Sequence, residues 1–456
     1  MTDLEWTLDK ADGTWKRDLW GPEMFTAQVH RLGSGHLDIS LCTVFTASLA
    51  PEELEKRMAH AWRIVRDRFP QLVVRIVNEP KADNENYNRL HYDQASAATS
   101  AEQTFVVHRA NGDDEAFRKY HSEITSKPCG PISLHLFRTS SQRHAVYLYA
   151  PHTLVDIEAL LHVFNRLFEA MATPVEELET DPTQRLPPPV PIALLPSAPS
   201  GDIPAFIGSQ LGPIPELMPG TPKLQLSGPL GNGSCYPTRR QFDEAQSAKI
   251  LAKLKQLGLS IAHAQDAGAQ LAIAEQEGVT GGKSVNYPVS VGVRRFFKPD
   301  LQTEYVAWGI GGLQLTFDLG SVDSKAREEK FLDLMRQVQP QYQAALKDAT
   351  IATSQHPANL ALGADKGLPP LAPPSAHVVS SVGRLDDMLR PDLYAPIIKI
   401  EDVHEAQRHG IMAVPTFHTW TLNGRLTIQM SVSEPLAPIV DQVLDRYESL
   451  LHSLAD

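Results

Sequence analysis

The most regular hydrophobic pattern of the chain lies between residues 144 and 168. A nearly continuous apolar run over 145–150 predicts a buried strand. Apolar residues then recur at helical spacing over 157–168, which predicts a helix with one buried face. His152 and Asp156 lie between the two elements. A titratable side chain at such a junction is held by both elements and can point into a cavity.

Hydrophobic spacing predicts the other elements of the first half. Pro51 and a set of apolar residues repeating every three or four positions predict a helix over 51–69, and Pro70 ends it. Apolar and β-branched runs predict strands over 24–47, 72–76, 105–107 and 134–137. The polar segment 80–103 is predicted to be a loop.

The second half alternates helical and strand patterns in the same way. The sequence predicts helices over 243–257, 261–277 and 323–347, and strands over 285–293, 305–317, 376–382 and 394–400. Gly309, Gly311 and Gly312 lack side chains in the strand predicted over 305–317, so another backbone or a ligand can approach it there. A hairpin is predicted over 417–432 because Asn423-Gly424 is a strong turn signal. Ser433 is predicted to cap a final helix.

A change in composition separates the two halves. Twelve of the 35 prolines fall within 182–222, so this stretch sustains neither a helix nor a central strand. It is predicted to be a crossover on the surface, and a second Pro-rich loop is predicted over 357–374. The resulting division is a first domain (1–180), a crossover (181–238) and a second domain (239–456). Each domain is predicted to be a mixed β-sheet flanked by helices, which is an α/β fold.

Composition excludes several classes of function. The formal net charge of −12 and the lack of a Lys/Arg run argue against a nucleic-acid partner. No apolar run is long enough to span a bilayer, and the acidic start is unlike a signal peptide. The three cysteines are far apart, which argues against disulfides or a metal site and favours a reducing compartment. We therefore expect a cytoplasmic protein without membrane association or bound metal.

The spacing His-x-x-x-Asp is weak evidence by itself. In a chain with 17 histidines about one chance match is expected, and His452 and Asp456 supply one at the end of a terminal helix. His152 differs because it follows a buried strand and precedes an amphipathic helix. That context, and not the spacing, makes it a candidate general base.

The segment around His152 resembles the active-site segment of the HxxxD acyltransferase superfamily. This group includes chloramphenicol acetyltransferase, the plant BAHD enzymes and the condensation domains of peptide synthetases. Looser similarities follow in matching order over 54–76, 288–295, 380–383 and 424–431. In length and in the Pro-rich crossover the chain resembles in particular fungal secondary-metabolite O-acyltransferases of the trichothecene 15-O-acetyltransferase kind. Ile157 stands where the superfamily usually has Gly.

The resemblance implies a fold and a reaction. Two chloramphenicol-acetyltransferase-like domains would enclose a channel in which His152 is the general base. The enzyme would be an acyl-CoA-dependent O-acyltransferase that acts, as a monomer, on a hydroxyl or amine of a hydrophobic secondary metabolite. Asp156 would pair with Arg294 or Arg295 and so orient the loop. The candidates for binding the substrate or the oxyanion are Trp308, Ser380, Ser381, His418 and Thr419.

Several alternatives stay open from the sequence. Asp156 is equally well explained as the N-cap of its helix, and the two arginines as a solvated strand end. His404 and His409 are predicted to lie on a polar loop. The fold could instead serve cyclisation or isomerisation of one substrate, or take its thioester from an acyl carrier protein. A non-catalytic binding or scaffold protein is the third reading.

Overall fold

The structure, a computed structural model, contains three sheets in its described part. The described residues are 4–82, 85, 87–139, 142–173, 181–196, 235–278, 284–353, 378–409 and 415–455. The five-stranded sheet has the order β13 (Ile398–Gln407), β3 (Ile39–Ala47), β8 (Arg143–Ala150), β7 (Ser133–Arg138), β6 (Phe105–Arg109). The six-stranded sheet has the order β11 (Ile310–Asp318), β10 (Ser284–Gly292), β12 (Val378–Arg384), β14 (Thr416–Leu422), β15 (Arg425–Val432), β9 (Tyr236–Gln241). The four-stranded sheet has the order β1 (Thr7–Asp9), β2 (Thr14–Asp18), β5 (Asn88–Tyr92), β4 (Arg75–Asn78).

Helices cover these sheets. The long ones are α1 (Gly21–Leu32), α2 (Pro51–Arg68), α6 (Ile157–Ala172), α9 (Glu244–Gln256), α10 (Ile261–Gln276), α12 (Arg327–Ala345) and α16 (Ala437–His452). The short ones are α3 (Gln94–Thr99), α4 (Ala101–Thr104), α5 (Asp113–Lys119), α7 (Val190–Ala193), α11 (Pro299–Gln302), α13 (Thr350–Thr353) and α15 (Leu385–Met388). Two 3₁₀ turns matter for the site, η1 (Pro70–Val73) and η4 (Arg294–Phe296).

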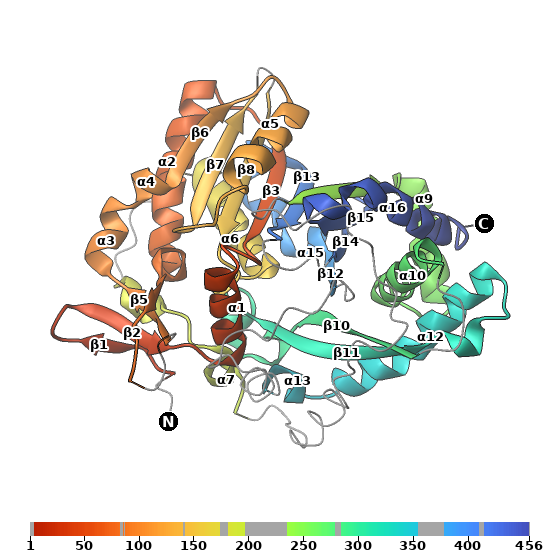
Figure 1. Cartoon of the computed structure of the whole chain (residues 1–456). Coiled ribbons are helices and arrows are strands. Elements are labelled where there is room, and N and C mark those ends of the chain that lie inside the picture. The colour runs from red at the N-terminus through yellow and green to blue at the C-terminus, as the bar shows by residue number, and fades with distance from the viewer. Residues whose placement is uncertain are drawn as a thin grey trace.

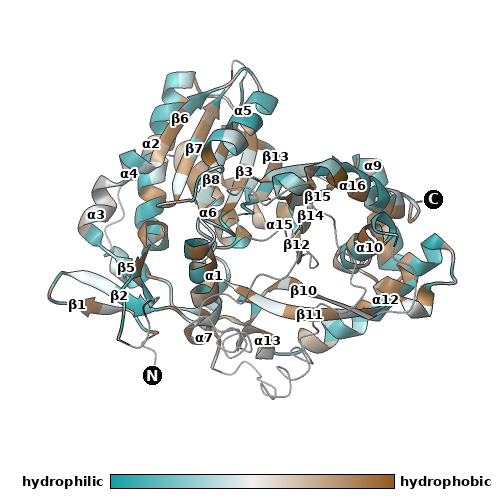
Figure 2. Ribbon diagram, in the orientation of Figure 1, coloured by the Kyte–Doolittle hydropathy of each residue, from teal (hydrophilic) through white to brown (hydrophobic). Residues whose placement is uncertain are grey.

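The first half is built on the five-stranded sheet. Helices α2 and α6 pack against each other beside it (Figure 1). Their apolar stripes and the sheet share one core, in which Trp62, Phe164 and Phe168 are fully buried. Figure 2 shows the same division, because strand β7 is largely brown and the outer turns of α2 and α5 are teal.

The second half is organised around α10. This helix is buried from Ala264 to Ala274 and contacts α12, α16 and the six-stranded sheet. Helix α16 can come close because residue 268 is Gly: a Cβ atom there would lie 2.3 Å from the ring of Tyr447. An Ala- and Gly-rich helix is therefore suited to this central place.

Strand β13 joins the two halves. It belongs to the second half of the sequence but pairs antiparallel with β3 at the edge of the five-stranded sheet. In Figure 1 the blue β13 lies beside the red β3. Val403 and Ile400 of β13 accordingly belong to the core of the first half. The domain limits at residues 180 and 238 stay a prediction. The chain also passes from one half to the other at β13.

Many predicted elements are confirmed. The helices predicted over 51–69, 243–257, 261–277 and 323–347 correspond to α2, α9, α10 and α12. The predicted hairpin is β14–β15, and Asn423 and Gly424 adopt φ values of 52° and 72°, as the tight turn requires. Of the predicted crossover, residues 181–196 and 235–238 are described. Residues 197–234, the predicted loop 357–374 and Asp456 lie outside the described residues.

Four predictions are wrong. The first part of the strand predicted over 24–47 is helix α1, with Pro22 in its first turn and Glu23 held by Arg17 at 2.6 Å. The loop predicted over 80–103 contains β5, α3 and α4, because the short polar segments pair or pack with distant residues. The strand predicted over 72–76 begins as the turn η1. The strand predicted over 394–400 lies later, at β13.

Two smaller corrections concern single residues. Ser433 forms no side-chain capping bond and precedes a 3₁₀ turn instead of the last helix. His404 is part of strand β13, and His409 is buried just after it, so neither lies on a polar loop. The prediction for His404 failed because β3, the strand that pairs with β13, is more than 350 residues away in the sequence.

Buried histidines make the stability of the protein depend on pH. Burial lowers the pKa of His36 to about 4, of His135 to about 4 and of His409 to about 3. Between these values and 6.5 the unfolded chain binds more protons than the folded one, so stability falls as the pH drops below 6.5. We expect the melting temperature to decrease steadily from pH 7 to pH 4.5. A melting temperature that is constant from pH 7 to pH 5 would contradict this.

Candidate active site

A short loop between β8 and α6 carries His152. The loop is closed by a backbone hydrogen bond from Leu154 N–H to the Pro151 carbonyl (3.0 Å). Gln71 of η1 donates its side-chain amide to the Leu154 carbonyl (2.8 Å) and so ties the loop to the first half. The loop is therefore held by one hydrogen bond between its own residues and one from Gln71.

The imidazole of His152 has a defined tautomer. Its Nδ1 lies 2.8 Å from the Val155 carbonyl oxygen, which can only accept, so Nδ1 carries the proton. The Nε2 atom is then the unprotonated nitrogen and can act as a base. Burial lowers the pKa of His152 below its usual value, while the hydrogen bond to Val155 and the charges of Asp156 and Glu405 oppose the shift. The ring is thus neutral at physiological pH.

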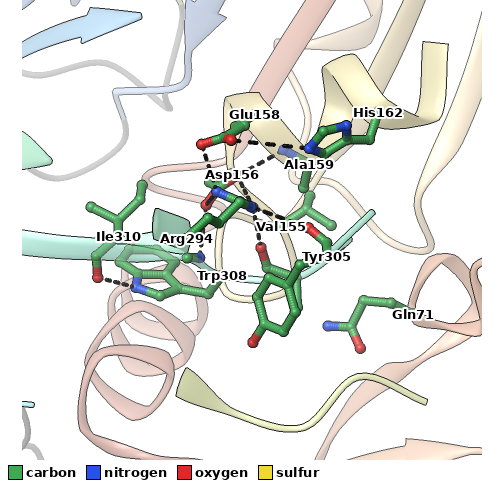
Figure 3. Close-up of polar contacts among 12 residues, drawn as sticks. Gln71, Val155, Asp156, Glu158, Ala159, His162, Arg294, Tyr305, Trp308 and Ile310 are labelled. Atoms are coloured by element: carbon green, nitrogen blue, oxygen red, sulfur yellow. Dashed lines mark hydrogen bonds and ion pairs between the residues drawn. The ribbon is translucent and has the colours of Figure 1, made fainter. Parts of the chain in front are cut away.

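Trp308 covers the imidazole from the second half. The two ring centroids are 4.6 Å apart with the planes tilted by 40°. The indole N–H donates to the Ile310 carbonyl at 3.1 Å (Figure 3). Because this N–H is already used, Trp308 acts on His152 as a packing surface and is a poor oxyanion donor.

Asp156 holds the loop and the two halves together. Its Oδ1 accepts the Ala159 N–H at 2.8 Å, which caps α6. The same carboxylate receives two bonds from Arg294 of the second half, at 2.7 and 3.0 Å, and the Gly309 N–H at 2.7 Å. The cap and the ion pair therefore coexist, and Figure 3 shows both.

Arg294 is buried and fully engaged. Besides Asp156 it contacts Glu158 at 3.0 Å and donates to the carbonyls of Tyr305 and Ala307. A Cβ atom at residue 309 would lie 2.7 Å from its guanidinium, which explains the Gly there. Arg295, the other arginine considered, is exposed and lies over the ring of Phe296.

The electrostatics of this pair follow from burial and charge. Desolvation alone would raise the pKa of Asp156, but Arg294 and the hydrogen bonds outweigh it and lower that pKa. Desolvation likewise opposes the charge of Arg294, yet Asp156 and Glu158 raise its pKa above the usual range. Both groups stay charged although Asp156 is only 1% exposed. The two groups are committed to each other, and the pair joins the His152 loop to the second half.

A cavity of about 230 Å³ opens between the two halves at His152. The first half contributes Ile39, His152 and residues 156–158 to its wall. The second half contributes Ser290, Val291, Gly292, Arg294, Ile310, Val378, Ser380, Ser381, Val382, Met388, Glu405, Gln407, Thr416 and His418. The candidate base therefore faces a space whose walls come from segments far apart in the sequence.

The cavity also brings the oxyanion candidates into view. Ser380 and Ser381 of β12 and His418 of β14 line it, and Ser380 is the register partner of His418. Thr419 is fully buried and is not part of the wall of this cavity.

Two charged residues of this cavity were missed by the sequence. Glu405 of β13 is 2% exposed, and its carboxylate lies 2.7 Å from Nδ1 of His418. Glu158, which contacts Arg294, was missed as well. No signal in the sequence marked Glu405, because it does not stand out among the other charged residues of β13, which include Lys399, Glu401 and Asp402. Glu158 lies on a helix surface and gave no signal either.

Three further features concern the described part of the chain. No group of three or more His, Cys, Asp and Glu side chains there is placed to hold a metal ion. No described helix combines the length and apolarity needed to cross a membrane. All three cysteines are buried and unpaired.

Comparison with known proteins identifies the fold. No family model and no curated protein sequence matches the chain. Among solved structures, trichothecene 15-O-acetyltransferase TRI3 from Fusarium sporotrichioides superposes with a TM-score of 0.82 at 13% identity, covering 98% of this chain and 97% of that one. The chain has the chloramphenicol acetyltransferase-like fold.

Other proteins of this chloramphenicol acetyltransferase-like fold superpose with lower TM-scores. Polyketide synthase associated protein 5 from Mycobacterium tuberculosis has a TM-score of 0.65 at 16% identity, covering 96% of this chain and 98% of that one. The first condensation domain of the calcium-dependent antibiotic synthetase gives 0.66 at 14% identity, with coverage of 96% and 97%. The fold predicted from the sequence is confirmed, and so is the likeness to acetyltransferases and condensation domains.

Proposed function

We propose that the protein is an acyltransferase that moves an acyl group from a CoA thioester to a hydroxyl or amine of a hydrophobic secondary metabolite. The observation that carries this proposal is His152: a neutral imidazole, with Nε2 unprotonated, at a cavity between the two halves. The likeness in fold to an O-acetyltransferase supports the same reaction.

In the proposed reaction His152 moves one proton twice. Its Nε2 removes the proton of the acceptor hydroxyl while the oxygen forms a bond to the thioester carbonyl carbon, and the carbonyl electrons move to its oxygen. The tetrahedral intermediate then collapses and breaks the C–S bond. The imidazolium returns the proton to the leaving thiolate, so that the products are an ester and a free thiol.

The oxyanion of the intermediate needs donors. Ser380, Ser381 and His418 are the candidates supported by the lining of the cavity. The Glu405 carboxylate lies 2.7 Å from Nδ1 of His418 and so orients the ring of this candidate donor. Trp308 instead would hold the imidazole of His152 in place.

The proposal is tested by thiol release. The purified protein is mixed with acetyl-CoA or a longer acyl-CoA and a panel of hydrophobic alcohols and amines, and free CoA is measured with a thiol reagent. We expect release that depends on both the acyl donor and an acceptor. Lack of release with every donor, in a folded protein, would overturn the proposal.

The proposed base also predicts a pH profile. The reaction needs neutral His152, and burial lowers the pKa of this ring. We therefore expect kcat/KM to be constant near neutral pH and to fall only below pH 6.5. Glu405→Gln should move this fall to lower pH, because the Glu405 carboxylate raises the pKa of His152. A midpoint above pH 7 for the unmodified protein would contradict the assignment.

A second candidate function uses the same cavity with another donor. The donor would be a thioester on an acyl carrier protein, or a single substrate would be cyclised or isomerised without a donor. Ile157, at the position where acyltransferases of this fold usually have Gly, lines the cavity and favours an altered reaction. Structures of similar fold include a cyclization-docking bidomain, at a TM-score of 0.63 and 13% identity. Turnover without CoA, or only with a loaded carrier protein, would favour this candidate.

A further inference from the structure

Helix α2 carries a buried arginine without a carboxylate partner. Arg66 is 3% exposed. Its Nη1 donates to the hydroxyl of Thr104 at 2.8 Å, and its Nη2 donates to the hydroxyl of Ser100. Among the described residues no carboxylate forms an ion pair with Arg66. Its Nε has no hydrogen-bond partner.

Two other buried arginines, Arg17 and Arg294, are neutralised by carboxylates, whereas Arg408 donates to the backbone carbonyls of Ser34 and Thr125. Arg17 faces Glu23 at 2.6 Å, with both side chains almost completely buried. Arg294 faces Asp156. A buried guanidinium without a counter-charge is costly, because it has left water without gaining an ion pair. The ring of Trp62, 5.5 Å from the Arg66 guanidinium, compensates only in part.

Arg66 borders a second cavity of the described residues. This cavity has a volume of about 780 Å³ and is lined from α1, η1, β4, α3, α4 and the loops at 128–131 and 151–154. Its charged wall consists of Arg31, Arg66 and Arg75 against Asp93, with His30 nearby. The Asp93 carboxylate already caps α3 by accepting the Ala95 N–H. The wall is therefore positive in a protein of net charge −12.

The remaining wall is largely apolar. It includes Leu72, Val74, Ile76, Leu154 and several prolines. A volume of this size suits a small organic molecule. A guanidinium has a planar fork of N–H donors that matches a carboxylate or a phosphate.

We propose that this cavity binds an amphipathic acid, whose carboxylate or phosphate group meets Arg66 and whose apolar body lies against η1 and β4. Exposed Arg31 and Arg75 attract the same anion. Pro151 and Leu154 belong both to the wall of this cavity and to the loop that bears His152, so the occupant contacts that loop. The ring of His152 faces the other cavity. The inference does not depend on acyl transfer.

The test measures binding and thermal stability of the full chain. The probes are decanoate, decyl phosphate, decanol, inorganic phosphate and CoA, each measured by calorimetry and by melting temperature. We expect decanoate or decyl phosphate to bind and to raise the melting temperature, and decanol to do neither. Preference for decanoate assigns a carboxylic acid. Preference for decyl phosphate assigns a phosphate ester. Binding of CoA supports the same assignment only if Arg66→Met weakens it, because the proposed acyl donor would also bind at the His152 cavity. Equal binding of decanol and decanoate would overturn the proposal.

Variants locate the site. Arg66→Met should raise the Kd of the acid by roughly 30-fold or more, the effect expected when one partner of a buried charged pair is removed. It should leave the melting temperature of the empty protein equal or higher, because an unpaired buried charge is lost. A merely structural Arg66, which ties α2 to Thr104 and Ser100, would instead lower that temperature and leave Kd unchanged, and this result would overturn the proposal.

Further variants serve as controls. Arg57→Met removes an arginine of the same helix that is paired with Glu53 at 2.6 Å, and it should not change the Kd. Arg75→Met removes an exposed arginine of the cavity and should weaken binding several-fold in a stable protein, which keeps the test valid if Arg66→Met does not fold. His152→Ala should retain acid binding even if it loses acyl transfer. Unchanged binding in Arg75→Met and Arg66→Met together would overturn the proposal.

Discussion

Replacing His152 by Ala should lower kcat for acyl transfer by about 10²–10⁴-fold, the usual contribution of a general base. The melting temperature should change little, because the imidazole is only partly buried and makes one hydrogen bond within its own loop. The measurement is the rate of thiol release at saturating donor and acceptor, together with a thermal melt of each protein.

Two variants make the result specific to His152. His152→Gln can preserve the hydrogen bond to the Val155 carbonyl but supplies no base, so it should be as inactive as His152→Ala. His162→Ala removes a histidine of α6 that does not line the cavity, and it should retain activity. Equal activity in His152→Gln and the unmodified protein would show that the base lies elsewhere.

Replacing Asp156 by Ala should destabilise the protein by about 3–5 kcal/mol, the usual result of leaving one partner of a buried ion pair alone. The structural reason is that Arg294 would be left buried without its main counter-charge, and α6 would lose its cap. Activity should fall as well, because the loop that aims His152 loses its anchor. Urea unfolding monitored by circular dichroism measures the change in stability.

The two roles of Asp156 can be separated. Asp156→Asn keeps a good N-cap for α6 but removes the charge, so its loss of stability reports the ion pair. The double variant Asp156→Ala/Arg294→Met should be more stable than Asp156→Ala alone, since no buried charge is then unpaired. If the losses of the two single variants simply add in the double variant, the two side chains are not energetically coupled and the proposed anchor is wrong.

Local patterns in the sequence were sufficient for several elements. The apolar stripe of α2 and its proline boundaries, the apolar stripe of α6, and the Asn423-Gly424 turn each specify a structure within a few residues. The resemblance around His152 then predicted the fold, and the structure confirms it. The two helices and the turn have in common that residues close together in the sequence specify them.

Elements that depend on distant partners were mispredicted. The segment that becomes β13 was predicted to end at residue 400 and the following histidines to lie on a loop, whereas pairing with β3 extends the strand to Gln407. Segment 80–103 was predicted to be a loop because it is polar. It contains β5, which pairs with β2 and β4 over most of its length. Strand propensity depends on the partner strand, and the sequence does not name that partner.

The position of His152 between a buried strand and an amphipathic helix follows from the sequence, because hydrophobic periodicity reflects burial along one segment. The packing of the two halves brings Arg294, and not Arg295, to Asp156. It also places Glu405 beside His418, with both residues at the cavity of His152. These residues come from strands and turns of opposite halves. Their meeting depends on how two sheets pack, and no local pattern of side chains encodes that geometry.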